Sequence, residues 1–194
     1  MEFLGYDGYE GDPDVYPPSE DSVQLIESLD VRPGSEFLEI GCGSGIVSVH
    51  AALNGARVTA VDINPRAVEI TRINAEAHGT RLDAFQSDLF SDVEGVFDLV
   101  VFNLPYLPVE EGEVDGMISR AWAGGADGLG PLPELLAHCP GHLKRGGKLV
   151  IVVSSLMDGG ALDGALSGYG TRVLSESHMF FETLRVLEIS FPGI

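Results

Sequence analysis

The run Asn103-Leu104-Pro105-Tyr106 contains the residue types needed to hold a planar NH2 group. The Asn103 side chain and the Leu104 backbone each offer a carbonyl oxygen that can accept an N–H bond, and Tyr106 offers a flat ring. Such acceptors can orient a weakly nucleophilic nitrogen and exclude water from it. No side chain in the run is a strong base, which suits a reaction whose proton leaves last. The alternative is a simple strand-to-loop turn, for which Asn-x-Pro is common.

A second candidate site is the glycine-rich run Glu39-Ile-Gly41-Cys42-Gly43-Ser-Gly45. Glycine lacks a Cβ atom, so its backbone can take positive φ and approach a ligand closely. The dinucleotide-binding fingerprint is broken here, because Ile46 stands where its third glycine is required. Asp62 could accept hydrogen bonds from two ribose hydroxyls. We therefore expect a ribose-bearing ligand, with a structural turn and a solvated carboxylate as the alternatives.

Both candidate runs follow predicted buried strands. Glu36 to Ile40 leads into the glycine turn, and Phe97 to Phe102 is almost uniformly apolar, as in a strand buried on both faces of a parallel sheet. Ile46 to Leu53 should form the helix after the turn, and Arg57 to Asp62 the second strand. Ligands of open α/β sheets bind at the carboxyl ends of the strands, so the Asn103 run should lie beside the glycine turn.

The rest of the chain continues this alternation. Ser19 can cap a helix that Arg32-Pro33-Gly34 ends, and Asn64 can cap a helix that begins at Pro65 and reaches about His78. A long loop is expected from Leu104 to about Gly130. Strands are expected at 82–86, 148–154, 171–179 and 183–191, and helices at 133–143 and 158–166. The last two strands are too close in sequence for a parallel crossover, so the fold should be a mostly parallel α/β sheet with an antiparallel C-terminal pair.

Composition predicts one domain that carries its charge outside. The chain has 194 residues, so we expect an N-terminal arm over 1–18 and a single domain over 19–194. The net charge of −19 makes a nucleic-acid partner unlikely, because such partners normally require basic clusters. With Lys144 and Lys148 as the only lysines, the composition indicates a halophilic protein. In molar salt the Debye length of about 3 Å weakens the charge argument, and an ordinary acidic cytosolic enzyme is the alternative.

The sequence gives no sign of a metal site or a membrane segment. Cys42 and Cys139 are too few for a disulfide framework or a four-ligand zinc site, and the five histidines are scattered. No apolar run reaches the roughly 18 residues of a membrane helix, and the N-terminus does not read as a signal peptide. We therefore expect a cytoplasmic protein with no metal and no membrane partner.

These runs together resemble the seven-stranded S-adenosylmethionine-dependent methyltransferases, whose first motif is acidic residue-x-Gly-x-Gly-x-Gly. The resemblance covers nearly the whole chain and implies a Rossmann-like α/β fold with helices on both faces and S-adenosylmethionine as cofactor. It implies that Glu39 and Gly41 border the methionine part, Asp62 holds the ribose, and Asp88 with the Leu89 backbone reads the adenine, although Asp88 could instead cap a turn. The implied cofactor-binding residues are Tyr16, Ser22, Glu39, Gly41, Cys42, Gly43, Gly45, Asp62, Ile63, Asp88, Leu89 and Asn103.

The Asn103 run resembles the Asn-Pro-Pro-Tyr signature of methyltransferases that act on glutamine amides or exocyclic base amines. Leu104 replaces the first proline and leaves the backbone acceptor intact. Residues 15–22 are similar to the entrance segment of the archaeal and eukaryotic HemK-like release-factor glutamine methyltransferases, and residues 120–128 are similar to their Arg-Ala-Trp-x-Gly-Gly-x-Asp-Gly loop. That resemblance implies that Ser22 contacts the cofactor carboxylate. It also implies substrate contacts by Asn103, Tyr106, Arg120 and Trp122; the alternatives are a surface ion pair for Arg120 and a loop anchor for Trp122.

The resemblance implies a protein-glutamine N5-methyltransferase acting on the Gly-Gly-Gln motif of a translation release factor. Only an arm and one helix precede the first strand, so we expect a small zinc-binding activator subunit to form a heterodimer with the chain. The edge strand Leu82 to Gln86 offers unpaired backbone groups and the side chains of Leu82, Ala84 and Phe85. Rival functions are adenine-N6 methylation of nucleic acid, protein-lysine methylation, and a cofactor-binding scaffold subunit without turnover.

Overall fold

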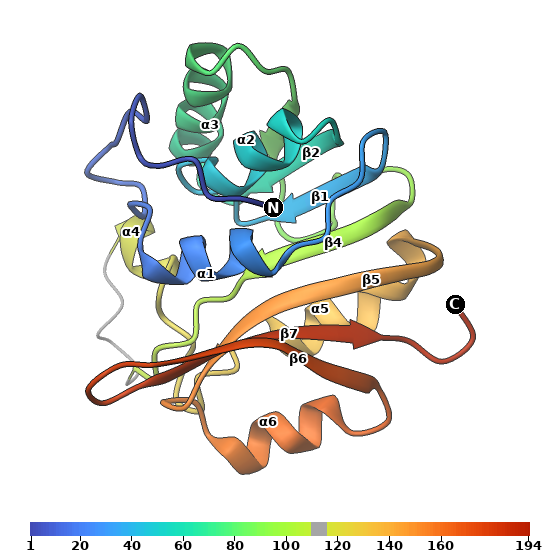
Figure 1. Cartoon of the computed structure of the whole chain (residues 1–194). Helices are drawn as coiled ribbons and strands as arrows, with labels where there is room; N and C mark the ends of the chain where they lie inside the picture. Colours follow the sequence, from blue (N-terminus) through green and yellow to red (C-terminus); the bar gives the residue numbers. More distant parts are fainter. Residues whose placement is uncertain (110–115) are drawn as a thin grey trace.

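In the computed structural model, which describes residues 1–109 and 116–194, seven strands form one sheet in the order β3-β2-β1-β4-β5-β7-β6 (Figure 1). The strands are β1 (Glu36–Ile40), β2 (Arg57–Asp62), β3 (Asp83–Gln86), β4 (Phe97–Asn103), β5 (Leu143–Ser154), β6 (Gly170–His178) and β7 (Thr183–Ser190). Neighbours from β3 to β5 are parallel, and β7 is antiparallel to both β5 and β6. The predicted mostly parallel sheet with an antiparallel C-terminal pair is confirmed.

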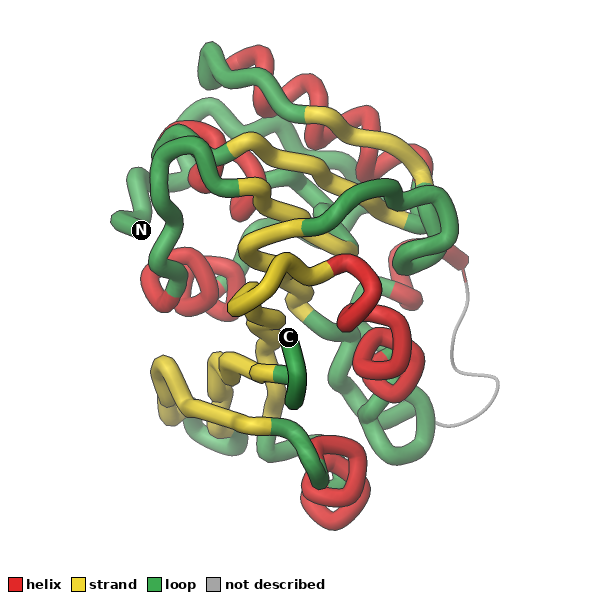
Figure 2. The backbone as a smooth tube through the Cα atoms, turned by 90° about the vertical axis from the view of Figure 1, so that its right-hand side faces the viewer, coloured by secondary structure: helices red, strands yellow, loops and turns green. Residues whose placement is uncertain are grey.

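Helices cover both faces of this sheet (Figure 2). They are α1 (Glu20–Ser28), α2 (Ile46–Leu53), α3 (Pro65–Ala77), α4 (Gly116–Arg120), α5 (Leu132–His138) and α6 (Gly159–Leu166), with a 3-10 turn at Cys139–His142. Phe37 and Val101 pack with α1 and α2 in one buried cluster. Their chain neighbours Leu38 and Val100 pack with α5 in another. Successive strand residues thus face opposite cores, which is why these strands read as unbroken apolar runs.

Two predicted boundaries near β5 are wrong. The helix expected to reach residue 143 ends at His138, and a 3-10 turn follows that contains Pro140, which has no backbone N–H to continue an α-helix. The strand expected at 148 begins at Leu143, which pairs with Phe97. The register shifts between Phe97 and Leu99, so β5 passes through a glycine pair that, from sequence, reads as loop.

The N-terminal arm contains no helix or strand, yet it is fixed to the domain. The Leu4 N–H donates to His50 Nε2 at 3.0 Å, and the Tyr9 hydroxyl lies 3.1 Å from His50 Nδ1. The backbone of Glu10 exchanges hydrogen bonds with the Asn74 amide, at 2.6 and 3.0 Å. These contacts carry the arm across α2 and α3 and bring Tyr16 to the carboxyl edge of the sheet. None of the helices in the described residues is long and apolar enough to cross a membrane.

Candidate active site

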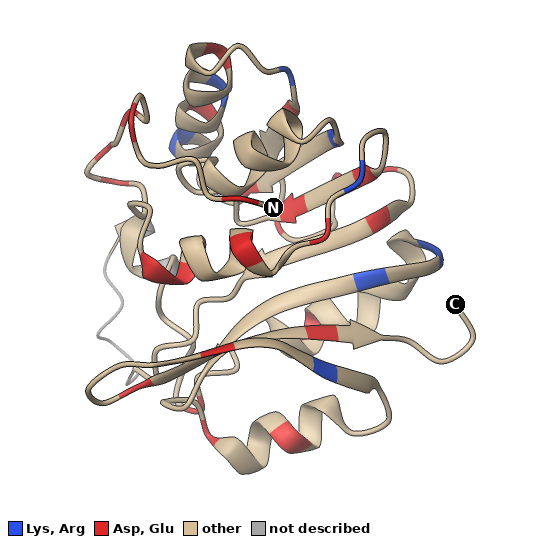
Figure 3. Ribbon diagram, in the orientation of Figure 1, with Lys and Arg blue, Asp and Glu red and all other residues tan. Residues whose placement is uncertain are grey.

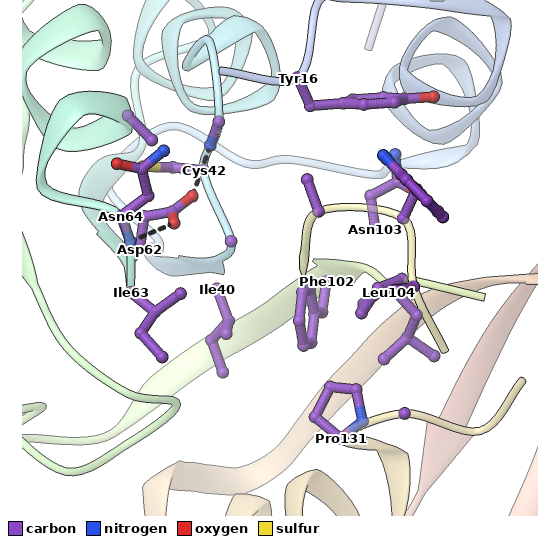
Figure 4. A pocket seen from close by; sticks show the side chains of 18 of the residues that line it. Tyr16, Ile40, Cys42, Asp62, Ile63, Asn64, Phe102, Asn103, Leu104 and Pro131 are labelled. Carbon is purple, nitrogen blue, oxygen red and sulfur yellow. Dashed lines mark hydrogen bonds between the residues drawn. The ribbon is translucent and has the colours of Figure 1, made fainter. Parts of the chain in front are cut away.

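A cavity of about 1120 Å³ opens at the carboxyl edge of β1, β2 and β4 (Figure 4). Asp62 and Asn64 lie on one side of it, and Asn103 and Leu104 lie on the other. The predicted residues that line it are Tyr16, Ser22, Glu39, Gly41, Cys42, Gly43, Asp62, Ile63, Asp88, Leu89, Asn103, Leu104, Pro105, Tyr106 and Trp122. The two runs identified from sequence therefore meet in one site.

The glycines of the turn have different structural roles. Gly41 has φ +66°, and a Cβ atom there would lie 2.6 Å from Cε2 of Phe102, so only glycine lets the turn pass against β4. Gly45 does not line the cavity. A Cβ atom at Gly45 would lie 2.9 Å from the Thr71 Cα, so this glycine allows α2 to begin close against α3. The first glycine shapes the ligand side of the turn, and the last shapes the helix packing.

Asp62 is held so that both carboxylate oxygens have a fixed position. Its Oδ2 accepts from the Gly43 N–H at 2.9 Å, and its Oδ1 accepts from the Asn64 N–H at 2.8 Å. Each oxygen keeps a further lone pair, and the side chain is only partly buried. Burial raises the pKa of Asp62, and the two backbone donors oppose that rise. The carboxylate can therefore accept hydrogen bonds from two neighbouring hydroxyls of a ligand.

The segment after β3 contains the one non-glycine residue with positive φ in the described part of the chain, Leu89 at +47°. Ser87 holds this conformation: its hydroxyl donates to the Leu89 carbonyl at 3.1 Å and accepts from the Asp92 N–H at 3.1 Å. Such strained backbone persists where the surroundings impose it, often at ligand sites. Asp88 and Leu89 both border the cavity, so the segment that Ser87 fixes is part of the site.

Asn103 is the last residue of β4, paired in register with Val152. Its Oδ1 is buried and has no hydrogen-bond partner in the described part of the chain. An unsatisfied buried acceptor costs about 1–3 kcal/mol, and native proteins rarely leave one without a reason. Asn103 lines the cavity, so a turn of its side chain would bring this oxygen to a ligand N–H there.

Sequence reasoning missed Asp21, which connects α1 to the Asn103 run. Its carboxylate is 4% exposed, and its Oδ2 accepts from the hydroxyls of Tyr16 at 3.3 Å and Tyr106 at 3.5 Å. Its Oδ1 accepts from the Ser19 hydroxyl at 2.5 Å. Burial, followed by the charge of Asp21, raises the pKa of Tyr16 and of Tyr106, so both rings stay neutral donors. Asp21 thus fixes two aromatic rings that line the cavity.

The loop after Tyr106 folds back against the Asn103 run. Leu107 N–H donates to the Trp122 carbonyl at 2.9 Å, and Trp122 lines the cavity. A Cβ atom at Gly124 would lie 2.7 Å from the Pro105 carbonyl oxygen, and one at Gly128 would lie 2.8 Å from that of Tyr106. The glycines of this loop thus permit close backbone packing. The Arg120 side chain, predicted to contact substrate, lies outside the described residues.

Residues 20–169 match the family model of the methyltransferase small domain. The chain belongs to this methyltransferase family. A protein of Methanocaldococcus jannaschii, provisionally named protein N5-glutamine methyltransferase, is 42% identical over 146 residues, 74% of each chain. Ribosomal RNA small subunit methyltransferase C of Chromohalobacter salexigens is 34% identical over 138 residues, 69% of this chain and 37% of that one.

The fold is also that of solved methyltransferases. The E. cuniculi Mtq2-Trm112 complex, described as responsible for methylation of the eRF1 translation termination factor, matches with a TM-score of 0.70 and 23% identity. The match covers 92% of this chain and 99% of that one. The family resemblance inferred from the sequence and the seven-stranded methyltransferase sheet are both confirmed.

Glu39 lies beneath the glycine turn of this methyltransferase and is 3% exposed. Burial raises the pKa of Glu39 to about 8, and a hydrogen bond from the Ser48 hydroxyl opposes that rise. Because the folded state binds this proton more tightly than the unfolded chain, the resulting stability is complete below pH about 4.5 and is lost as pH rises to about 8.

Glu39→Gln should remove this loss of stability. As pH increases from 4.5 to 8, the free energy of unfolding of the wild type should fall by a few kcal/mol relative to that of the variant, at about 1.4 kcal/mol per pKa unit. The melting temperature of the variant should therefore rise relative to that of the wild type. Thermal melts across that range test this. The exposed Glu94→Gln is the matched control and should follow the wild-type curve. Parallel curves for Glu39→Gln and wild type would show that Glu39 is ionised throughout.

Proposed function

We propose that this methyltransferase uses S-adenosylmethionine to methylate the side-chain amide of a protein glutamine. The observation that carries the proposal is the buried Oδ1 of Asn103, which lacks a partner in the described residues and belongs to a side chain that lines the cavity. An acceptor oxygen that is shielded from water and has no hydrogen-bond partner in the described residues suits a substrate that supplies an N–H donor.

The residues of the cavity fit the cofactor. The two free lone pairs on Asp62 suit the ribose hydroxyls, and the strained segment at Asp88 and Leu89 suits the adenine. The Ser22 hydroxyl lines the cavity but donates to Asp21 Oδ1 at 3.1 Å, so it would have to rotate to donate to the cofactor carboxylate. The Gly41 turn gives the close backbone approach that a bound ligand needs. When bound, the cofactor would supply an electrophilic methyl group: its sulfonium S–CH3 bond would break as the amide nitrogen forms the N–CH3 bond, S-adenosylhomocysteine would be the leaving group, and one amide proton would then be lost to solvent.

The residues of the Asn103 run position the acceptor. Asn103 Oδ1 and the Leu104 carbonyl can accept the two N–H bonds of a planar amide, while Tyr106, held by Asp21, packs against its face. Orientation and exclusion of water are the contributions this site can make, because the run contains no base. An amide nitrogen becomes acidic on methylation, so a base is not required.

The charge of the site favours a protein acceptor over nucleic acid. The described lining contains five carboxyl side chains and no Lys, Arg or His; the five are Asp14, Asp21, Glu39, Asp62 and Asp88. Figure 3 shows further Asp and Glu along the arm and α1. A phosphate backbone normally requires Lys or Arg contacts. The likeness to a ribosomal RNA methyltransferase supports a base amine as the second candidate acceptor, but this chain covers only 37% of that relative.

A translation release factor is the proposed acceptor protein, and a small zinc-binding activator is the proposed partner. Support comes from the Mtq2-Trm112 complex, which methylates a termination factor and shares this fold. The β3 strand is an edge of the sheet, as predicted. The apolar side chains of β3 face inward, however, as does that of Leu82 just before it: Ala84 is 2% exposed, and Leu82 and Phe85 pack against the buried core. A partner would therefore use mainly the unpaired backbone groups of β3.

One experiment tests the acceptor and the partner together. The chain is purified from its host, and labelled methyl transfer is measured into release factor, a lysine-bearing basic protein and DNA, with and without the co-purifying subunit. We expect label on a glutamine of the release factor, and more of it with the subunit present. Label on DNA or on lysine would reject the glutamine assignment, and full activity of a monodisperse monomer would reject the activator.

A further inference from the structure

The hairpin that joins β6 to β7 ends in two exposed phenylalanines. Phe180 is 100% exposed and Phe181 is 92% exposed, and their ring centroids lie 6.3 Å apart. Scattered single apolar side chains are normal on protein surfaces, but adjacent ones form a continuous apolar patch that commonly marks an interaction site. Neither ring packs on the domain that carries it.

These two residues are not explained by the turn they occupy. Met179 and Glu182 exchange two backbone hydrogen bonds, at 2.7 and 3.4 Å, which close a two-residue loop. Such loops favour Asn, Asp or Gly at positive φ. Neither phenylalanine has positive φ, because Leu89 is the only non-glycine residue that does in the described part of the chain. Residues that contradict a local preference are expected at functional positions.

The hairpin tip lies at the same sheet edge as the methyl-transfer cavity. Asn103 pairs with Val152 on β5, and Ser154, two residues further, pairs with Leu184 at the start of β7. The Ser154 hydroxyl donates to Glu182 Oε1 at 2.6 Å, directly beside the tip. In Figure 1 the tip projects on the same side as α1 and α4. The tip and the cavity therefore lie at the same end of the sheet.

We propose that Phe180 and Phe181 anchor the acceptor protein while its glutamine occupies the cavity. This proposal rests on the proposed function. Asp21 and Glu182 are acidic, and the described cavity lining contains no Lys, Arg or His. The matching surface of the acceptor protein should therefore be an apolar patch surrounded by neutral or basic residues. The sheet order places β3 and β6 at opposite edges. An activator on β3 would therefore leave the hairpin tip free for the acceptor.

The double variant Phe180→Ser/Phe181→Ser tests the anchor, because serine removes both rings and is a common turn residue that adopts negative φ without strain, as both positions require. The matched control is Val96→Ser, which replaces an exposed apolar residue just before β4, at the amino-terminal end of that strand and thus away from the cavity. Methyl transfer is measured into whole release factor and into a short glutamine peptide that cannot reach the tip. We expect the double variant to raise KM for the whole protein at least about tenfold. KM for the peptide and the affinity for S-adenosylmethionine should not change, and Val96→Ser should alter none of them.

The possible results separate the anchor from the proposed function. An unchanged KM for the whole protein, with glutamine methylation intact, overturns the anchor alone. Absence of glutamine methylation by the wild-type chain overturns the proposed function, and the anchor with it. The wild-type chain could also float with anionic vesicles or self-associate, and the double variant could lose that behaviour with KM unchanged. That result would assign the tip to a membrane or to a second copy and would also overturn the anchor.

Discussion

Replacing Asn103 by alanine should lower the rate of methyl transfer by about 10²–10³-fold, while the affinity for S-adenosylmethionine stays within a few fold. Loss of one oriented group that acts on the reacting atoms typically costs this much. The Oδ1 of Asn103 has no partner in the described residues, so its expected role begins only when an acceptor N–H arrives. Single-turnover rates at saturating cofactor, together with calorimetric titration, measure the two quantities.

The same variant has a stability signature that separates positioning from folding. Alanine removes a buried acceptor that is unpaired in the described structure, so the melting temperature should stay the same or rise. A merely structural asparagine would lose stability and activity together. A variant that turns over like wild type would remove Asn103 from the chemistry, and one that melts much earlier would show that its amide supports the fold.

The parts of the fold and site that follow from local sequence could be predicted. The apolar run before Asn103 gave the end of β4 to within one residue, because a strand buried on both faces admits little else. The Asn64-Pro65 pair gave the start of α3, and the Asn64 side chain does accept from the Arg66 N–H. The convergence of Glu39, Asp62 and Asn103 followed from the rule that parallel strands bind ligands at their carboxyl ends.

Contacts between distant segments could not be predicted in this way. In the sequence, Asp21 appears only as an acidic residue favouring a helix start, whereas its role depends on Tyr106, which lies 85 positions later. The arm reads as irregular because it forms no regular element, and its order comes from His50 and Asn74 on two helices. β5 begins early because Leu143 pairs with Phe97, a contact that local glycine content obscures. In each of these cases a tertiary contact, and not the local sequence preference, determines the structure.

Replacing Asp62 by alanine should weaken S-adenosylmethionine binding by about two to four orders of magnitude. Hydrogen bonds to a charged group contribute roughly 1.5–3 kcal/mol each, and Asp62 can offer two to the ribose. It also fixes the Gly43 and Asn64 backbone N–H groups, so the turn itself should loosen. The control Asp98→Ala removes a partly exposed strand carboxylate away from the cavity and should leave cofactor affinity unchanged.

Calorimetry with S-adenosylmethionine and, separately, with NAD tests this prediction. Unchanged affinity for S-adenosylmethionine in the Asp62 variant would remove this residue from the cofactor site. Saturable NAD binding without S-adenosylmethionine binding in the wild type would overturn the proposed cofactor, because Asp62 alone suits any ribose, whereas the broken pyrophosphate signature at Ile46 argues against NAD.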